Sequence, residues 1–295
     1  MYLMKRIQNL IIALIFFNIL SVFSQEENTV SPDAKKDIDN FLNLNICIEN
    51  KDLSFDFLKK NIKNSNVRSE KYFWFKSKKI QLEQVGSLGS NFITAGIHND
   101  TVYTVYIELN SEISKLLNEL AQKDIEIKKG LEKNWFLKDN YSIDEVKSIN
   151  YVYRFESNKV KEKILKQVHD YFQNYNNIEI PNDLKESYDL LMNPVIFYDY
   201  GVDKCYANKI EPTGRKAINQ LFKNNRIDLI KNVLRSPNTE ARIYALEVLF
   251  FSRNMNKYDV EVMNKIEKLP FMISVCKDCF VDLKTNMEII KSLKK

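Results

Sequence analysis

Two runs of alternating apolar and polar residues between positions 91 and 110 constrain the fold of this chain more than any other feature. The apolar positions are Ile93, Ala95 and Ile97 in the first run and Tyr103, Val105, Ile107 and Leu109 in the second. A period of two is typical of a strand with one buried face. Asn99 and Asp100 stand between the runs, and both residue types tolerate the positive φ of a tight turn. The pattern therefore predicts a β-hairpin.

Similar patterns flank this hairpin. The sequence predicts three or four antiparallel strands within residues 71–109, and a further strand at 149–157. Apolar residues three and four apart predict helices after Ser111 and over 159–175. Because the strands are clustered rather than alternating with helices, we expect residues 31–200 to form an α+β domain with an antiparallel sheet.

The remainder of the chain has a different character. Residues 201–212 lack a helical period and indicate a junction, whereas 213–295 are expected to form an all-helical domain. A helix over 236–253 would begin with Ser236 as its cap and Pro237 at its first position.

This last helix, together with the helix expected at 227–234, resembles a HEAT-like repeat. The matching residues are Pro237, Ala241, Arg242, Ala245 and Leu249. The resemblance covers about 40 residues and implies paired helices, a surface that binds proteins, and Arg242 near the turn. Since the chain holds one good copy, a small helical bundle is the alternative.

The N-terminus has the features of an export signal. Lys5 and Arg6 precede an apolar run over residues 7–23, and Val22 and Ser24 are small enough for a signal peptidase. We predict a signal peptide over 1–24, cleavage between Ser24 and Gln25, and an unstructured leader over 25–30. A retained membrane anchor is the alternative. No later run is apolar enough to span a bilayer, so the mature protein is expected in the periplasm or outside the cell.

The charge balance argues against a nucleic-acid partner. The chain carries 44 basic and 39 acidic residues, mixed along its length. Nucleic-acid binders usually concentrate basic residues on one face.

The four cysteines, Cys47, Cys205, Cys276 and Cys279, favour disulfides in an exported chain. We expect a structural bond between Cys276 and Cys279, with Cys205 bonded to either as the alternative. A redox motif of the thioredoxin type would need strands and a helix after Cys279, where 16 residues remain. A zinc site would need paired ligand spacing beyond this pair, which the sequence lacks.

No motif for catalysis, a cofactor or a metal stands out, and His98 and His169 are far apart, with His98 expected to be exposed beside the hairpin turn. Alternation would send Tyr72 and Trp74 to one side of their strand, as a platform for a peptide or a sugar. The alternative is a strand buried on both faces. Tyr72, Trp74 and Arg242 are therefore the candidate binding surface.

These observations predict an exported, non-catalytic interaction or scaffold protein of the cell envelope. Its expected partner is another protein, with a peptide or a glycan as alternatives. The rival prediction is an enzyme, either a hydrolase with dispersed carboxylates or a thiol–disulfide oxidoreductase that uses Cys276 and Cys279.

Overall fold

A computed structural model gives the arrangement of much of the chain. It describes residues 54–56, 60, 65–86, 89–109, 111–123, 125, 128, 135–141, 147–173, 177–201, 205, 211–277 and 280–294. The predicted signal peptide over 1–24, the leader over 25–30 and the helix expected from Ser31 lie outside the described residues.

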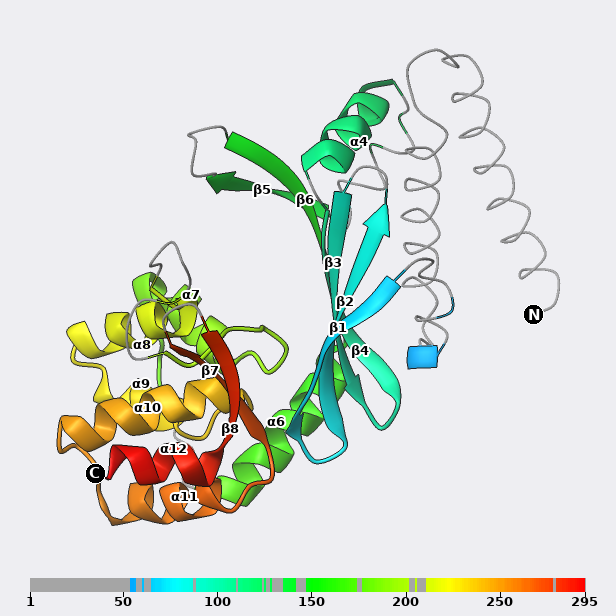
Figure 1. Cartoon of the computed structure of the whole chain (residues 1–295). Helices are drawn as coiled ribbons and strands as arrows, with labels where there is room; N and C mark the ends of the chain where they lie inside the picture. Colours follow the sequence, from blue (N-terminus) through cyan, green and yellow to red (C-terminus); the bar gives the residue numbers. More distant parts are fainter. Residues whose placement is uncertain are drawn as a thin grey trace.

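The first half of the described chain forms one antiparallel sheet, as the sequence predicts (Figure 1). Its strands are β1 (Ser65–Trp74), β2 (Ser77–Gly86), β3 (Gly89–His98), β4 (Thr101–Glu108), β5 (Trp135–Tyr141) and β6 (Lys147–Glu156). They are hydrogen-bonded in the order β1-β2-β3-β4-β6-β5. The expected hairpin is β3 and β4, and its turn residues Asn99 and Asp100 have φ angles of 48° and 60°. The α+β class is therefore confirmed.

The two faces of the sheet differ. One face carries a layer of buried apolar side chains, namely Ile80, Leu82, Ile93, Ala95, Ile97, Val105 and Ile107. On the other face, a Cβ added to Gly96 would lie 2.5 Å from Val195 Cγ1, so the backbone of β3 approaches the segment after α7 too closely for a side chain. This second face packs against the helical part of the protein.

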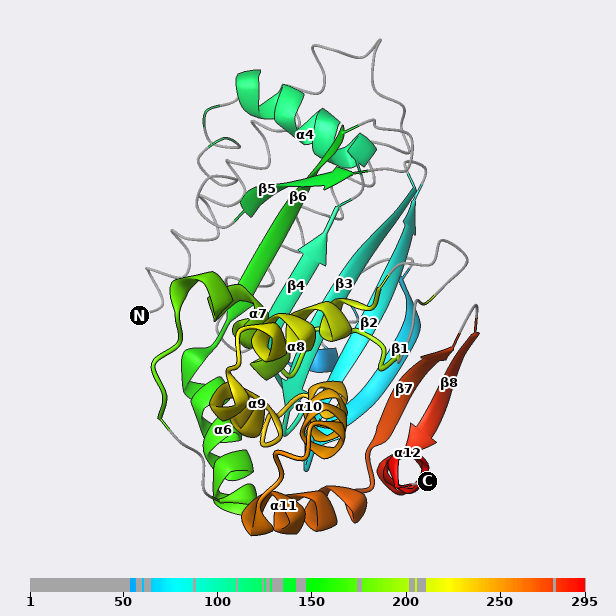
Figure 2. The same cartoon turned by 90° about the vertical axis from the view of Figure 1, so that its left-hand side faces the viewer.

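The helical part begins before the expected junction. Its helices are α6 (Asn158–Phe172), α7 (Asn182–Met192), α8 (Thr213–Lys223), α9 (Ile227–Val233), α10 (Thr239–Phe251), α11 (Lys257–Glu267) and α12 (Asn286–Leu293), and α4 (Ser111–Lys123) lies beside the sheet. Helix α6 extends from the sheet to α11 (Figures 1 and 2), where Lys265 Nζ donates to the Tyr171 carbonyl at 2.8 Å. One buried cluster runs from Phe73 through α6 and α7 into α8–α12.

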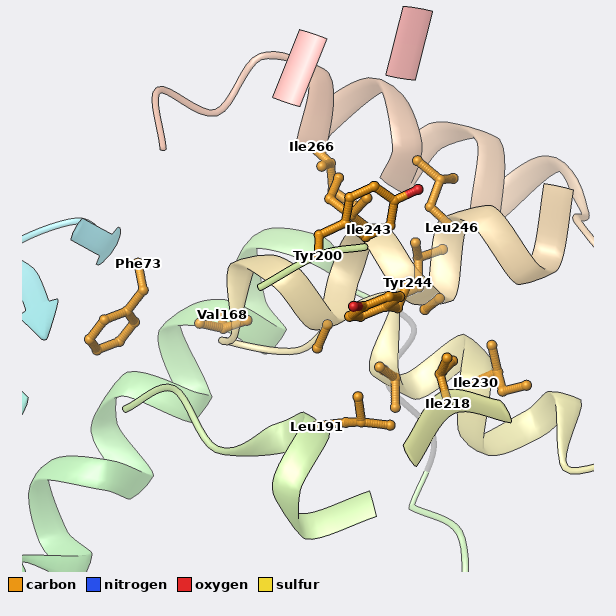
Figure 3. Packing of buried hydrophobic residues seen from close by; sticks show 14 of the residues in the cluster. Phe73, Val168, Leu191, Tyr200, Ile218, Ile230, Ile243, Tyr244, Leu246 and Ile266 are labelled. Carbon is orange, nitrogen blue, oxygen red and sulfur yellow. The ribbon is translucent and has the colours of Figure 1, made fainter. Parts of the chain in front are cut away.

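Helix α10 is the centre of this cluster. Its side chains are buried on nearly every side, and Figure 3 shows Ile243, Tyr244 and Leu246 projecting from it among residues of neighbouring elements. A helix that is apolar around most of its circumference is typical of a protein interior. The helix pair behind the HEAT-like resemblance is present as α9 and α10, and the repeat itself stays a prediction.

The expectation of an all-helical C-terminal domain is wrong in one place. Strands β7 (Met272–Lys277) and β8 (Phe280–Thr285) form an antiparallel hairpin between α11 and α12. Tyr200 extends this hairpin by one bridge, because its N–H donates to the Ser274 carbonyl at 2.7 Å and its carbonyl accepts from Cys276 N at 2.8 Å. This pairing with a distant segment stabilises a strand that local periodicity does not distinguish from a helix.

Candidate functional site: a cleft beside strand β1

A cleft of about 620 Å³ lies between the free edge of the sheet, α10 and the C-terminal hairpin. Figure 2 shows β1 at that edge of the sheet with β7 and β8 next to it. Its lining includes Arg68–Tyr72 of β1, Lys79 and Gln81 of β2, Phe197–Asp199, Glu240 of α10, and residues of β7 and β8. Clefts that gather buried ionisable groups are candidate binding or active sites.

Strand β1 lines the cleft with its backbone edge. The five consecutive residues Arg68–Tyr72 all contact the cleft. Successive side chains of a strand point to opposite faces, so a cleft that contacts five in a row follows the edge of the strand. Because β1 pairs only with β2, this edge has no strand partner in the described part of the chain.

Irregularities at both ends limit this free edge. The pairing of β1 with β2 shifts between Val67 and Ser69 and again between Tyr72 and Trp74, which makes Arg68 and Phe73 extra residues of β-bulges. The regular edge is therefore the four-residue run between the bulges, 69–72. Bulges on an edge strand hinder pairing with another long strand, so the free edge suits a short partner segment.

The opposite wall of the cleft is apolar. Met272 and Ser274 of β7 and Val281 and Leu283 of β8 line it. Ser274 is the cross-strand partner of Leu283, which places both on one face of the hairpin. Met272, Val281 and Leu283 are 36%, 50% and 58% exposed. Exposed apolar side chains clustered in a groove are typical of a binding surface.

Two buried lysines and a glutamate form the floor. Lys71 Nζ is ion-paired with Glu240 Oε1, and Lys79 Nζ lies 3.9 Å from Glu240 Oε2. Lys79 also donates to the Ile196 carbonyl at 2.9 Å, and its ammonium lies 4.2 Å from the centre of the Phe197 ring. The floor thus joins β1, β2 and α10 through charged groups that are nearly inaccessible to water.

The start of α10 holds Glu240 in place. The Asn238 side chain accepts hydrogen bonds from the N–H groups of Glu240 and Ala241, both at 3.1 Å. Asn238 is therefore the cap of α10, and the expectation that Ser236 caps it is wrong. The Ser236 hydroxyl instead donates to the Leu191 carbonyl at 2.7 Å, which leaves the cap to the next side chain that reaches the free N–H groups.

Burial shifts both lysine pKa values downward. Removal of the ammonium from water lowers the pKa of Lys79 to about 7, opposed by the negative charge of Asp199. Burial also holds the pKa of Lys71 well below its ordinary value, and the neighbouring charge of Lys79 adds to the effect. Near neutral pH, Lys79 therefore changes its charge readily.

The structure separates the three residues predicted to form a binding surface. Tyr72 is 52% exposed and lines the cleft. Trp74 and Arg242 are 2% and 0% exposed, so their assignment to a surface is wrong. The bulge at Phe73 breaks the expected alternation: Phe73 and Trp74 are both buried, while Tyr72 and Phe75 are both exposed. The alternative of a strand buried on both faces is wrong for the same reason.

Arg242 is buried because α10 is the central helix. Its guanidinium carbon lies 6.0 Å from the centre of the Trp74 ring and 5.5 Å from that of Phe172. Within the described residues, its side-chain nitrogens have no hydrogen-bond partner. Burial lowers the pKa of Arg242 to about 9. The guanidinium is therefore stabilised by cation–π contacts with the Trp74 and Phe172 rings.

The disulfide differs from the expected pairing. Cys276 is bonded to Cys205, so the preferred Cys276–Cys279 bond is wrong, and Cys279 lies outside the described residues. The bridge between Tyr200 and Val275 brings the two cysteine segments together.

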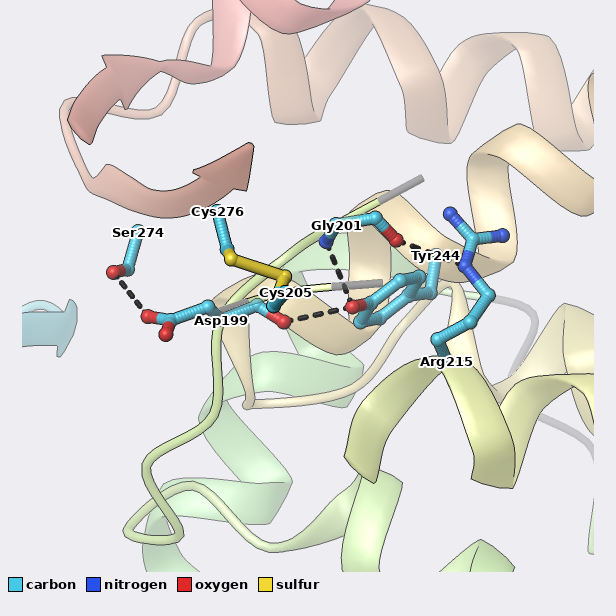
Figure 4. Close-up of a disulfide and its surroundings, with 7 residues drawn as sticks. All are labelled: Asp199, Gly201, Cys205, Arg215, Tyr244, Ser274 and Cys276. Carbon is cyan, nitrogen blue, oxygen red and sulfur yellow. Dashed lines mark hydrogen bonds between the residues drawn. A yellow bond between two sulfur atoms is a disulfide. The ribbon is translucent and has the colours of Figure 1, made fainter. Parts of the chain in front are cut away.

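A hydrogen-bond network surrounds this disulfide (Figure 4). The Tyr244 hydroxyl accepts from Gly201 N at 2.9 Å and donates to the Asp199 carbonyl at 2.7 Å, and Arg215 Nε donates to the Gly201 carbonyl at 3.0 Å. The Ser274 hydroxyl donates to the Asp199 carboxylate, next to the cleft. The network and the disulfide together hold the hairpin wall of the cleft.

His98 is buried, contrary to expectation. Its side chain is 5% exposed, and its Nδ1 lies 2.7 Å from the Ser77 hydroxyl. The neighbouring Asn99 N–H donates to the Lys76 carbonyl at 3.0 Å, which joins the turns of two adjacent hairpins. Burial lowers the pKa of His98.

Sequence reasoning missed Lys71, Lys79 and Glu240. Nothing distinguishes two lysines on strands in a chain with 44 basic residues. Among the described residues, no group of three or more His, Cys, Asp or Glu side chains is arranged to hold a metal ion, and no helix is long and apolar enough to cross a membrane.

Comparison with protein-family models, with curated proteins and with solved structures finds no match to this chain.

Proposed function

We propose that this chain is an exported, non-catalytic interaction protein of the cell envelope that binds an extended segment of another protein along β1. The observation that carries the proposal is the cleft contact of five consecutive β1 residues, Arg68–Tyr72. A free strand edge offers unpaired backbone N–H and C=O groups, and addition of a strand to such an edge is a common mode of peptide recognition.

The apolar wall of the hairpin supports the same proposal. A bound strand projects every second side chain to one face, so its apolar side chains would contact Met272, Val281 and Leu283. Backbone hydrogen bonds would supply affinity, and these contacts would supply specificity. The two bulges favour a partner segment of about four paired residues over a long strand.

Export belongs to the proposal. The predicted signal peptide supports it, and so does the Cys205–Cys276 disulfide, because stable disulfides are typical of oxidising compartments. The HEAT-like resemblance also stays part of the proposal, with α10 as the support of the cleft.

Peptide selection tests the proposal. A random peptide library displayed on phage is selected against the mature chain, and the selected peptides are synthesised with single N-methyl groups along the backbone. We expect binding to be lost at alternate positions, because every second N–H of an added strand points toward β1. Failure to select any peptide, or binding that is indifferent to N-methylation at every position, would overturn the proposal.

Two variants locate the binding. Leu283→Glu puts a charge on the apolar wall and should weaken binding about tenfold or more, because the partner's apolar side chains would lose their contact. Phe251→Glu is the matched control, since Phe251 is 65% exposed and lies outside the cleft lining. Equal effects of the two variants would contradict the assignment. Self-association of the chain that Leu283→Glu abolishes would identify a second copy as the partner and would also contradict it.

Different observations bear on the two enzyme alternatives, a hydrolase and an oxidoreductase. A hydrolase is favoured by the presence of Glu240 and Asp199 in the cleft lining, although Glu240 is ion-paired with Lys71 and Asp199 accepts from Ser274. Turnover of a peptide or glycoside substrate that Glu240→Gln abolishes would favour this alternative. For an oxidoreductase, Cys205 and Cys276 are only 0% and 4% exposed, which prevents attack by a substrate thiol.

A further inference from the structure

We infer that the segment bound along β1 carries an aspartate or glutamate side chain that pairs with the ammonium groups of Lys71 and Lys79. This inference rests on the proposed function and adds the chemistry of the partner.

The floor of the cleft gathers buried ammonium groups from two strands. Lys71 of β1 and Lys79 of β2 line it together with the carboxylates of Glu240 and Asp199. Glu240 serves both lysines, since its Oε1 pairs with Lys71 and its Oε2 lies 3.9 Å from Lys79 Nζ, and Asp199 accepts from the Ser274 hydroxyl. The charge of Arg242, which lies outside the cleft lining, further disfavours the charged form of Lys71. A buried ammonium is costly unless a counter-charge compensates it, and a carboxylate in the cleft would do so.

The lysines have unused hydrogen-bond donors. An ammonium has three N–H donors and no acceptor. Within the described residues, Lys79 donates one hydrogen bond, to the Ile196 carbonyl, and Lys71 donates one, to Glu240. Both side chains line the cleft although they are only 1% and 9% exposed. A carboxylate in the cleft would accept from these donors.

The sheet register places the acidic side chain. Lys71 and Lys79 are cross-strand partners, so their side chains point to the same face of the sheet. A partner residue paired beside Lys71 on the free edge would point to that face as well. Its carboxylate would then lie next to both ammonium groups, while the residues before and after it would point to the opposite face.

The titration of Lys79 links this binding to pH. Its pKa is about 7 in the free protein, and a neighbouring carboxylate favours the charged ammonium. The groups that face it are Lys71, Asp199, Glu240 and the Phe197 ring. The affinity for an acidic segment should therefore fall as pH rises above about 7, because binding must then restore the proton on Lys79.

A cycle of peptide and protein variants tests the inference. The probes are a selected peptide, its Glu→Gln or Asp→Asn version, and the parent peptide with an amidated C-terminus. Lys79→Met should lower the affinity for the acidic peptide about tenfold and leave the affinity for the neutral version unchanged. Such a coupling is typical of close charge pairs. Lys216→Met is the matched control, because Lys216 is exposed on α8 and outside the cleft lining. If Lys79→Met does not fold, the affinity of the unaltered protein from pH 6 to pH 9 supplies the same test.

Each outcome has a separate meaning. Equal affinity of the acidic and neutral peptides, with binding still lost at alternate N-methyl positions, would overturn the inference and leave the proposed function standing. A loss of affinity on C-terminal amidation alone would identify the terminal carboxylate as the anion and would also overturn it. Absence of any peptide binding would overturn the proposed function itself.

Discussion

Cys205 and Cys276 are 71 residues apart in the sequence, and their Cα atoms are 5.8 Å apart in the folded chain. The bond closes a long loop, and the entropy that a cross-link removes from the unfolded chain increases with loop length. We expect the paired substitution Cys205→Ala and Cys276→Ala to lower the free energy of unfolding by about 4 kcal/mol, as measured by urea denaturation.

Cys279→Ala is the control for this prediction and should leave the free energy of unfolding unchanged. Digestion under non-reducing conditions, followed by mass spectrometry, should yield a peptide pair joined through Cys205 and Cys276. A bond between Cys276 and Cys279 in the purified protein would contradict the structure.

Substitution of Arg242 by methionine should stabilise the protein. The guanidinium is fully buried between aromatic rings and has no hydrogen-bond acceptor among the described residues. Methionine keeps much of the volume without the cost of a buried charge, which exceeds the cation–π attraction of about 2 kcal/mol. We expect a gain of about 1–3 kcal/mol in thermal or urea unfolding. Arg242→Ala, which leaves a cavity, should instead destabilise. A less stable methionine variant would contradict this account.

Stability should rise with pH above neutrality because of Lys79. Its pKa is about 7 when folded and 10.5 ordinarily, so between these values the unfolded chain holds a proton that the folded chain lacks. The free energy of unfolding therefore increases with pH through this window, and the full burial penalty applies below pH 7.

Lys79→Met removes this dependence. The variant should be more stable than the unaltered protein at pH 7, and the difference should shrink by up to about 3 kcal/mol by pH 9.5. Urea titrations at several pH values measure it, with Lys78→Met as the control. Parallel pH profiles for the unaltered protein and Lys79→Met would show that Lys79 keeps its ordinary pKa.

Gly214→Ala should destabilise α8 despite the higher helix propensity of alanine. A Cβ at Gly214 would lie 2.6 Å from ring atoms of both Tyr198 and Tyr244. Displacement of packed rings typically costs about 1–3 kcal/mol, which exceeds the propensity gain of about 1 kcal/mol. Thermal unfolding measures the change, and a Tm equal to or above that of the unaltered protein would show that the rings move freely. Lys216→Ala, elsewhere on α8, is the control for propensity alone.

The local sequence pattern was sufficient to predict several of the helices and strands. The alternation around Asn99 and Asp100 predicted β3 and β4, because a period of two and a tight turn are properties of neighbouring residues. The apolar stripe of α6 was predicted equally well, and Ile164, Val168 and Phe172 are buried as expected. In both cases each residue's position follows from its neighbours along the chain.

The cleft could not be predicted in this way. Lys71 and Glu240 are 169 positions apart, and their contact depends on how the sheet packs against α10. The bulge that exposes Tyr72 and buries Trp74 depends on the register of β1 against β2. The partner of Cys276 depends on the bridge at Tyr200.

The sequence by itself determined the α+β class and the local course of its hairpin and helices, since periodicity and turn chemistry act over a few residues. Tertiary structure alone decided which charges share the floor of the cleft, which cysteine bonds to Cys276 and which edge of the sheet stays free. All three features depend on contacts between segments that are distant in the sequence. The free energy of such contacts cannot be predicted from a pattern of neighbouring residues.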